Sequence, residues 1–204
     1  MVDPAALPLF QATPALFTSV KERYAEPHRH YHVWAHIEQM VELFKTIETK
    51  LTHNEATLYA VYYHDAVYAV PSATNEEDSA TLFSAEASAH INTDIVETTK
   101  RFIVATKTHS IAEEMPGNEI SDCQYFLDID MSIVGAEPDI YRLYANNIRR
   151  EYAVIPDALY YSGRKQILTS FLEKDRIFLT DHFHNQFEAQ ARENVTAEIA
   201  RLVS

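Results

Sequence analysis

Glycine, cysteine and long apolar runs are all scarce in this chain. It has 3 glycines and 8 dispersed prolines among 204 residues, which indicates neither a turn-rich β architecture nor a disordered linker. The single cysteine, Cys123, excludes an intramolecular disulfide and fits a reducing compartment, so we expect a cytoplasmic protein. No apolar run reaches the ~18 residues that a membrane span needs, and residues 1–10 lack the basic region of a signal peptide.

Positive charge is also in deficit. The chain has 17 Lys and Arg against 30 Asp and Glu, a net charge of −13 at pH 7, which argues against electrostatic binding to a polymeric nucleic acid. A nucleotide substrate is not excluded, because a local arginine pair or a metal ion can override the global charge. The length and the 47% hydrophobic content suit one sizeable domain.

Helical periodicity dominates the chain, and no segment sustains the alternation of a β-strand. The predicted helices cover about 14–25, 31–49, 54–69, 76–90, 93–108, 121–134, 138–155, 157–173 and 183–202. We therefore predict an all-α fold, a single-domain helical bundle that spans residues 1–204.

The run LYAVYYHDAVYAV, residues 58–70, carries the most information. As a helix it is apolar or aromatic on every side, which predicts burial, yet it contains His64 and Asp65. An ionised carboxylate inside a protein is costly unless something neutralises it. A divalent metal ion bound by His64 and Asp65 together would do so. The sequence therefore predicts a metal site here.

A further histidine ligand is expected on the preceding helix. His36 shares a helix face with Met40 and Leu43, which places its ring on the core side, and His32 lies one turn earlier on that face. Taken alone, His36 is better explained as a core histidine held by a hydrogen bond. With His64 and Asp65, here called the dyad, also predicted to bind metal, a role for His36 as a metal ligand becomes the better explanation.

The segment FLDIDMSIVG, residues 126–135, offers two aspartates. Asp130 is centred on an apolar stripe, with Phe126 and Ile133 one turn to either side, whereas Asp128 lies on a more polar face. Residues two apart on a helix point about 200° apart, so we do not expect both to reach one ion. We predict that Asp130 is a ligand and that Asp128 orients a neighbouring side chain.

The order H…HD…D on three buried helices resembles the HD superfamily of metal-dependent phosphohydrolases. A longer resemblance, to a bacterial branch of predicted HD phosphohydrolases, covers nearly the whole chain from residue 24 onward. Its motifs are RHYHVWAHI (29–37), YYHDAVY (62–68), NEEDSA (75–80), FLDIDMSIVG (126–135), IRREY (148–152), SGRKQIL (162–168) and EAQARENV (188–195). The resemblance implies a metal-site core at about 24–135 and C-terminal helices at about 138–202 that complete the pocket.

The resemblance also implies the metal ligands and the reaction. It carries the four family ligands onto His36, His64, Asp65 and Asp130. Two imidazoles and two carboxylates suit Mn, Fe, Co, Ni or Zn, and suit Mg less well. Four protein ligands on an octahedral ion leave positions for water and substrate, as a catalytic site requires. The expected activity is hydrolysis of a phosphomonoester or a nucleotide.

Several polar residues near these motifs have two explanations each. Glu76 and Glu77 either transfer protons at the site or stabilise the N-terminus of a helix, where the helix dipole is positive. Asn75 is a substrate-binding candidate or only an N-cap. The family pattern places His109 at the site, where it would act on the phosphate, although it could merely favour a helix C-terminus. His32 is a further substrate-binding candidate.

Two arginines in the C-terminal part are candidates for phosphate binding. Arg164 lies on an apolar stripe, so its guanidinium must be paired, either with Glu151 or with a phosphate oxygen. Arg149 presents the same choice, as does Tyr152 one turn later. Structural pairing is slightly favoured, and a mixed role, in which Glu151 holds an arginine that also contacts the substrate, stays open. Glu188 and Arg192, at i and i+4, are expected to form a helix-stabilising pair.

Two other functions stay open. The first is a di-iron oxygenase, a minority chemistry on the HD scaffold, which would need His90 and His109 as extra ligands and two irons per chain. The second is a non-catalytic, metal-stabilised nucleotide-binding module, which would bind phosphate compounds without turnover. The oligomeric state is also open, since an all-α domain of this size often forms a homodimer through an apolar helix face.

Overall fold

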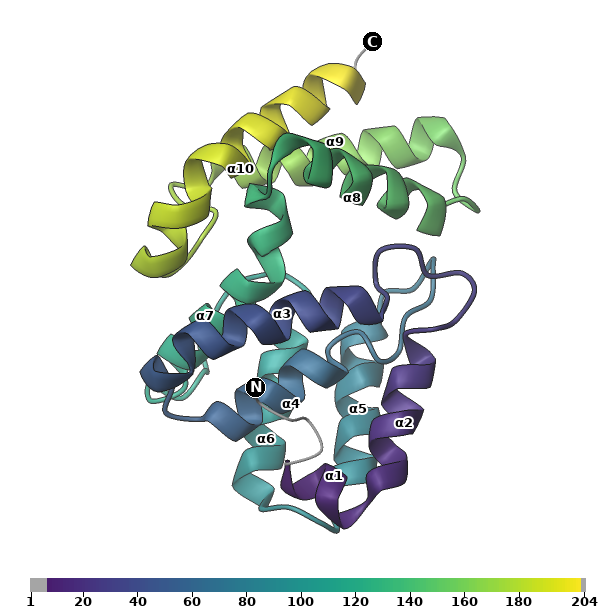
Figure 1. Ribbon diagram of the computed structural model, residues 1–204. Helices are drawn as coiled ribbons and strands as arrows, with labels where there is room; N and C mark the ends of the chain where they lie inside the picture. Colours follow the sequence, from purple (N-terminus) through teal and green to yellow (C-terminus); the bar gives the residue numbers. More distant parts are fainter. Residues whose placement is uncertain (1–6, 203–204) are drawn as a thin grey trace. The chain divides into compact units, whose positions relative to one another are not determined.

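The computed structural model describes residues 7–202, and this part of the chain is all-α, without a β-strand (Figure 1). Its α-helices are α1 (Pro8–Ala12), α2 (Pro14–Arg23), α3 (Trp34–Ile47), α4 (Asn54–Tyr63), α5 (Asn75–Ala87), α6 (Thr93–Ala105), α7 (Ile120–Met131), α8 (Pro138–Glu151), α9 (Asp157–Glu173) and α10 (Asp181–Leu202). Two 3-10 helices, η2 (Glu48–Lys50) and η3 (Ser132–Gly135), extend α3 and α7. The predicted all-α fold class is confirmed.

The chain divides into two compact units. The first ends at Leu127 and the second begins at Asp128, so the boundary falls within α7. Each unit has its own buried side chains. That the whole chain acts as one functional domain stays a prediction. None of the helices in the described part of the chain is both long and apolar enough to cross a bilayer.

Helix α4 lies at the centre of the first unit and packs against α3, α5 and α6. Its residues from Ala56 to Tyr63 are all buried. The ring of Tyr62 contacts Phe10 at 5.6 Å and Trp34 at 6.0 Å between centroids, and such aromatic contacts add to the burial of apolar area. Burial on every side of this helix, which its composition predicts, is confirmed.

The end of α4 differs from the prediction. The helix stops at Tyr63, whereas its apolar pattern continues to residue 69. Side chains from the start of α5 take the backbone groups that further helical turns would use. Ser79 Oγ accepts a hydrogen bond from the amide of Val67 at 3.0 Å, and the side-chain amide of Asn75 both accepts from and donates to the backbone of Ala69, each at 3.0 Å. The dyad at residues 64–65 therefore lies at the C-terminus of α4.

The second unit consists of η3, α8, α9 and α10 together with the end of α7. Asn194 of α10 donates from Nδ2 to the carbonyls of Val134 (3.0 Å) and Ala136 (2.7 Å), which fixes the path of η3. Gly135 lies against the backbone of Phe187, so closely that a Cβ would be 2.8 Å from the Phe187 carbonyl oxygen. Glycine is required here because of this close approach of η3 to α10.

Candidate metal-binding site

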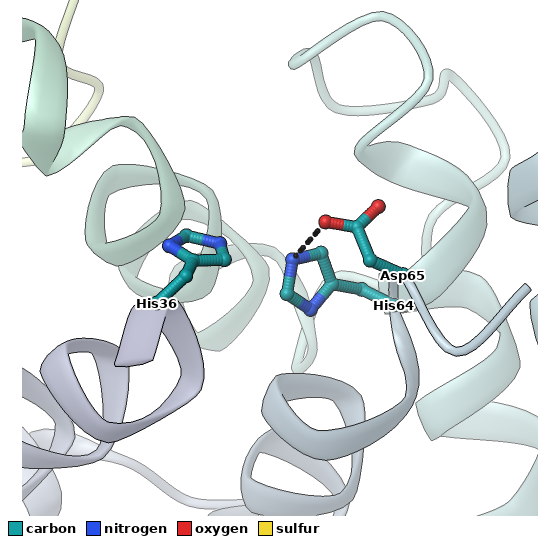
Figure 2. Close-up of side chains that lie close together, drawn as sticks. All are labelled: His36, His64 and Asp65. Atoms are coloured by element: carbon teal, nitrogen blue, oxygen red, sulfur yellow. Dashed lines mark ion pairs between the residues drawn. The ribbon is translucent and has the colours of Figure 1, made fainter. Parts of the chain in front are cut away.

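Three of the four predicted ligands lie together. His36 belongs to α3, and His64 and Asp65 follow the last residue of α4; the three side chains point into the same space (Figure 2). One ligand atom from each lies within 4.8 Å of the others. His64 Nε2 is 3.0 Å from Asp65 Oδ2, and the two imidazole centroids are 5.4 Å apart. Within residues 7–202, this is the group of three or more such side chains that is close enough to share an ion.

The cluster is buried on one side and accessible on the other. Both imidazoles are buried, whereas the Asp65 side chain is 17% exposed. The sequence pattern predicts Asp65 inside a buried helix, and this is wrong because α4 ends before it. The consequence favours a binding site, since a partly exposed carboxylate beside two buried imidazoles can be reached from solvent.

Hydrogen bonds orient both imidazoles. His64 Nδ1 is 3.1 Å from the carbonyl oxygen of Val61, and a carbonyl only accepts, so Nδ1 carries the proton and Nε2 faces Asp65. His36 Nδ1 is 3.1 Å from the hydroxyl of Tyr31. Metal-binding histidines commonly have their second ring nitrogen held in this way. The two contacts therefore preorganise the rings as ligands.

Arg29 also contributes to the site, although it is not among the residues predicted from the sequence. It is buried, and its guanidinium donates to the carbonyls of Asp65 (2.7 Å) and Ala66 (3.3 Å) as well as to the carboxylate of Glu26 (2.9 Å). It thereby fixes the backbone turn that carries the dyad. The signal was present in the sequence, because Arg29 begins the segment RHYHVWAHI and a buried arginine needs partners.

His32 lies beside the cluster, but it is not on the helix that the sequence predicts for it. Helix α3 begins at Trp34, so His32 lies in the preceding loop rather than on the face of His36. Its Nε2 is 3.8 Å from Asp65 Oδ2, and its ring packs on Tyr68 with centroids 4.3 Å apart. Its place beside the cluster is compatible with substrate binding, which stays a prediction.

Asp130 belongs to the second unit, and its role as the fourth ligand stays a prediction. On the continuous helix α7 it follows Phe126 by one turn. The ring of Phe126 packs against that of His64 with centroids 6.0 Å apart.

The interpretation of Asp128 as a residue on a more polar face is wrong. Asp128 is buried, and its carboxylate accepts from the amides of Leu179 and Thr180, both at 2.7 Å, and from the Thr180 hydroxyl at 2.6 Å. Burial raises the pKa of this carboxyl although the hydrogen bonds oppose the shift. Asp128 therefore anchors the loop that leads into α10.

The acidic start of α5 has mainly structural contacts. Asn75 is the first helical residue and not the N-cap, which is Thr74. Glu77 pairs with Lys107 across to the loop after α6, and that hydrogen bond lowers the pKa of the Glu77 carboxyl. Glu77 is therefore an anion near neutral pH. Glu76 is half-buried. Proton transfer by either glutamate stays a prediction.

His109 lies beyond α6 and not at its end. The helix stops at Ala105, and His109 has a φ of 47°, which is uncommon for a residue other than glycine. An interaction with the helix C-terminus is thus not supported, because that effect is limited to the last turn. His90 is exposed in the turn after α5. Neither histidine belongs to the described cluster, so the ligand set of a di-iron site is not assembled there.

The partner of Arg164 is not the predicted one. Its Nε and Nη2 donate to the carboxylate oxygens of Glu198 at 2.9 and 3.2 Å, and its guanidinium lies over the ring of Tyr144. Glu151 is therefore not the carboxylate that pairs with it. Glu198 is on α10, and sequence spacing gives no sign of this contact.

Arg149 has internal partners as well. It donates to the carbonyl of Tyr152 at 2.7 Å, pairs with Asp157 and lies 4.6 Å from the ring centroid of Tyr160. The ring of Tyr152 in turn packs on Tyr160. Structural pairing, the slightly favoured explanation, describes these contacts. The expected pair of Glu188 and Arg192 is present at 2.8 Å.

Comparison with protein-family models, with curated proteins and with solved structures found no match for this chain. Membership of the HD superfamily therefore stays a prediction from the motifs.

Proposed function

We propose that the chain is a metal-dependent phosphohydrolase of the HD type, which hydrolyses a small phosphorylated substrate. The observation that carries the proposal is the cluster of His36, His64 and Asp65, three chemically suitable side chains brought together from two separate segments. Asp130 is the proposed fourth ligand, because it lies one turn after the residue that packs on His64.

The donor set fits a divalent transition metal. Imidazole nitrogens suit Mn, Fe, Co, Ni or Zn better than Mg, and the carboxylates supply the negative charge that balances the ion. The oriented rings support the same conclusion, since Tyr31 and the Val61 carbonyl hold the Nδ1 atoms. When bound, such an ion activates water and withdraws charge from a phosphoryl oxygen.

The chain's own residues supply the positioning. Arg29 holds the backbone of Asp65, so that the carboxylate keeps its place beside His64. His32 lies at the more exposed side of the cluster, 3.8 Å from Asp65, where its imidazole can donate to a phosphate oxygen. Positioning of this kind lowers the entropic cost of bringing water and phosphorus together.

The test combines metal content with activity. Purified protein is analysed for bound metals and then assayed, with added Mn, Co or Ni, on an aryl phosphate and a set of nucleotides. We expect turnover in the wild type and loss of both metal and turnover in Asp65→Ala. The control is Asp175→Ala, at an exposed aspartate outside the cluster, and it should retain both properties.

Two further measurements make the result decisive. Circular dichroism must show that Asp65→Ala is folded, and Asp130→Ala should bind metal more weakly than the wild type. Metal-loaded wild type without turnover on any substrate would refute hydrolysis. Metal and turnover retained in folded Asp65→Ala would refute the site itself.

A further inference from the structure

A hollow lies within the second unit, among α8, α9 and α10, and has a volume of about 250 Å³. Its polar walls are formed by Arg142, Asn146 and Arg149 of α8, Tyr161 of α9, and Glu198 and Arg201 of α10. The three α8 residues follow one another at i, i+4 and i+7, which places them on one helix face. The hollow shares no residue with the metal cluster.

Arginines are concentrated around this hollow, although the chain as a whole has a net charge of −13. Three arginines line it against one carboxylate, that of Glu198. This carboxylate is already neutralised, because Arg164 donates to both of its oxygens and Tyr141 donates its hydroxyl. The guanidinium groups of Arg142 and Arg149 are balanced by Asp139 and Asp157, so an anion in the hollow competes with those two aspartates.

Arg149 is held in place, and the ion-pair partners of Arg149 and Arg142 are exposed aspartates. The contacts of Arg149 with the Tyr152 carbonyl and the Tyr160 ring fix its guanidinium. Its ion-pair partner Asp157 is 68% exposed, and Asp139, the partner of Arg142, is 86% exposed. Such exposed ion pairs contribute little to stability, so a bound anion can replace them at small cost.

We propose that this hollow binds a small phosphorylated molecule by its phosphate dianion. Guanidinium groups form paired, charge-assisted hydrogen bonds with phosphate oxygens, and the three oxygens of a phosphomonoester can engage more than one such group. A carboxylate has two oxygens and one charge, and would satisfy a single guanidinium. The volume suits a phosphate with a small substituent, which would lie against Tyr161.

Equilibrium dialysis with radiolabelled inorganic phosphate tests this site on full-length, metal-free protein. Removal of metal by a chelator separates the result from the proposed hydrolysis, which needs the ion. We expect saturable binding by the wild type, weakened about tenfold in Arg142→Gln and in Arg201→Gln, since each variant removes charge-assisted hydrogen bonds. Sulfate should compete and acetate should not.

Arg150→Gln is the matched control. Arg150 is an exposed arginine of the same helix that does not line the hollow, so this variant changes the net charge equally and should bind phosphate as the wild type does. Absence of saturable binding in the wild type would overturn the proposal. Equal weakening in Arg150→Gln would do so too, because it would show an effect of net charge rather than of a site.

Discussion

At the residue scale, Arg29 links the two segments on which the candidate metal site depends. It lies in the loop before α3, and its hydrogen bonds reach the turn after α4 that carries Asp65. A buried arginine of this kind is costly unless every donor has a partner. The contacts with Asp65, Ala66 and Glu26 provide those partners and make Arg29 a positioning residue.

Substitution of Arg29 should therefore affect both folding and metal binding. Arg29→Leu leaves buried carbonyls without donors, and we expect the free energy of unfolding to fall by about 2–4 kcal/mol in urea titrations. Arg29→Lys keeps the charge but lacks the planar fork. In this milder variant we expect metal affinity to fall about 10–100-fold, measured by competition with a chelating dye.

Arg150→Leu, at an exposed position, controls for the loss of one positive charge. It should change neither stability nor affinity. If folded Arg29→Lys binds metal as tightly as the wild type, Arg29 has no role in positioning the dyad.

At the element scale, the packing of η3 on α10 gives a sharp contrast between two glycines. A Cβ on Gly135 would meet the backbone of Phe187, whereas a Cβ on Gly163, in the exposed face of α9, would have nothing within 4 Å. The same substitution should thus have opposite effects at the two positions.

We expect Gly135→Ala to lower the free energy of unfolding by about 1–3 kcal/mol, because backbone atoms cannot move aside as a flexible side chain can. Gly163→Ala should raise it by about 0.5–1 kcal/mol, since alanine loses less entropy in a helix. Urea denaturation of both variants measures this. An unchanged stability of Gly135→Ala would contradict the close approach of η3 to α10.

At the scale of the whole molecule, buried carboxylates make stability depend on pH. Glu119 in the first unit is buried, which raises its pKa, but hydrogen bonds from Arg101 and Thr98 outweigh burial, so the folded pKa is below the ordinary value. In the second unit, amide donors from Phe178 and Ile177 and the side chain of Arg192 outweigh burial in the same way for Glu188. Both units contain such a group.

The direction of the pH effect follows from these lowered pKa values. Each group contributes stability that is fully present above its unfolded pKa of about 4.3 and is lost as the pH falls through its folded pKa. Glu119→Gln should be less stable than the wild type by about 1–3 kcal/mol near neutral pH. It should also lose less stability between about pH 6 and about pH 3.

Thermal unfolding followed by circular dichroism across this pH range provides the measurement. Glu113→Gln, at an exposed glutamate, should reproduce the wild-type pH profile. A Glu119→Gln profile as steep as that of the wild type would show that Glu119 does not contribute to the acid-induced loss of stability.

The sequence by itself determined the helical class and the nature of the candidate ligands. Period and composition are local properties, so the absence of strands from residues 7–202, the burial of α4 and the bounds of α9 could all be predicted. The residue types in H…HD…D likewise define a donor set without any coordinates. Their chemistry is intrinsic to the side chains.

The tertiary structure decided where helices end and which charged groups meet. α4 stops at Tyr63 because Ser79 and Asn75, from the start of α5, bind the backbone that follows. Arg164 pairs with Glu198, 34 residues away, and Asp128 binds the loop before α10. Such contacts have no period in the sequence, because a buried charge is satisfied by whichever group the packing of separate helices brings within hydrogen-bonding distance.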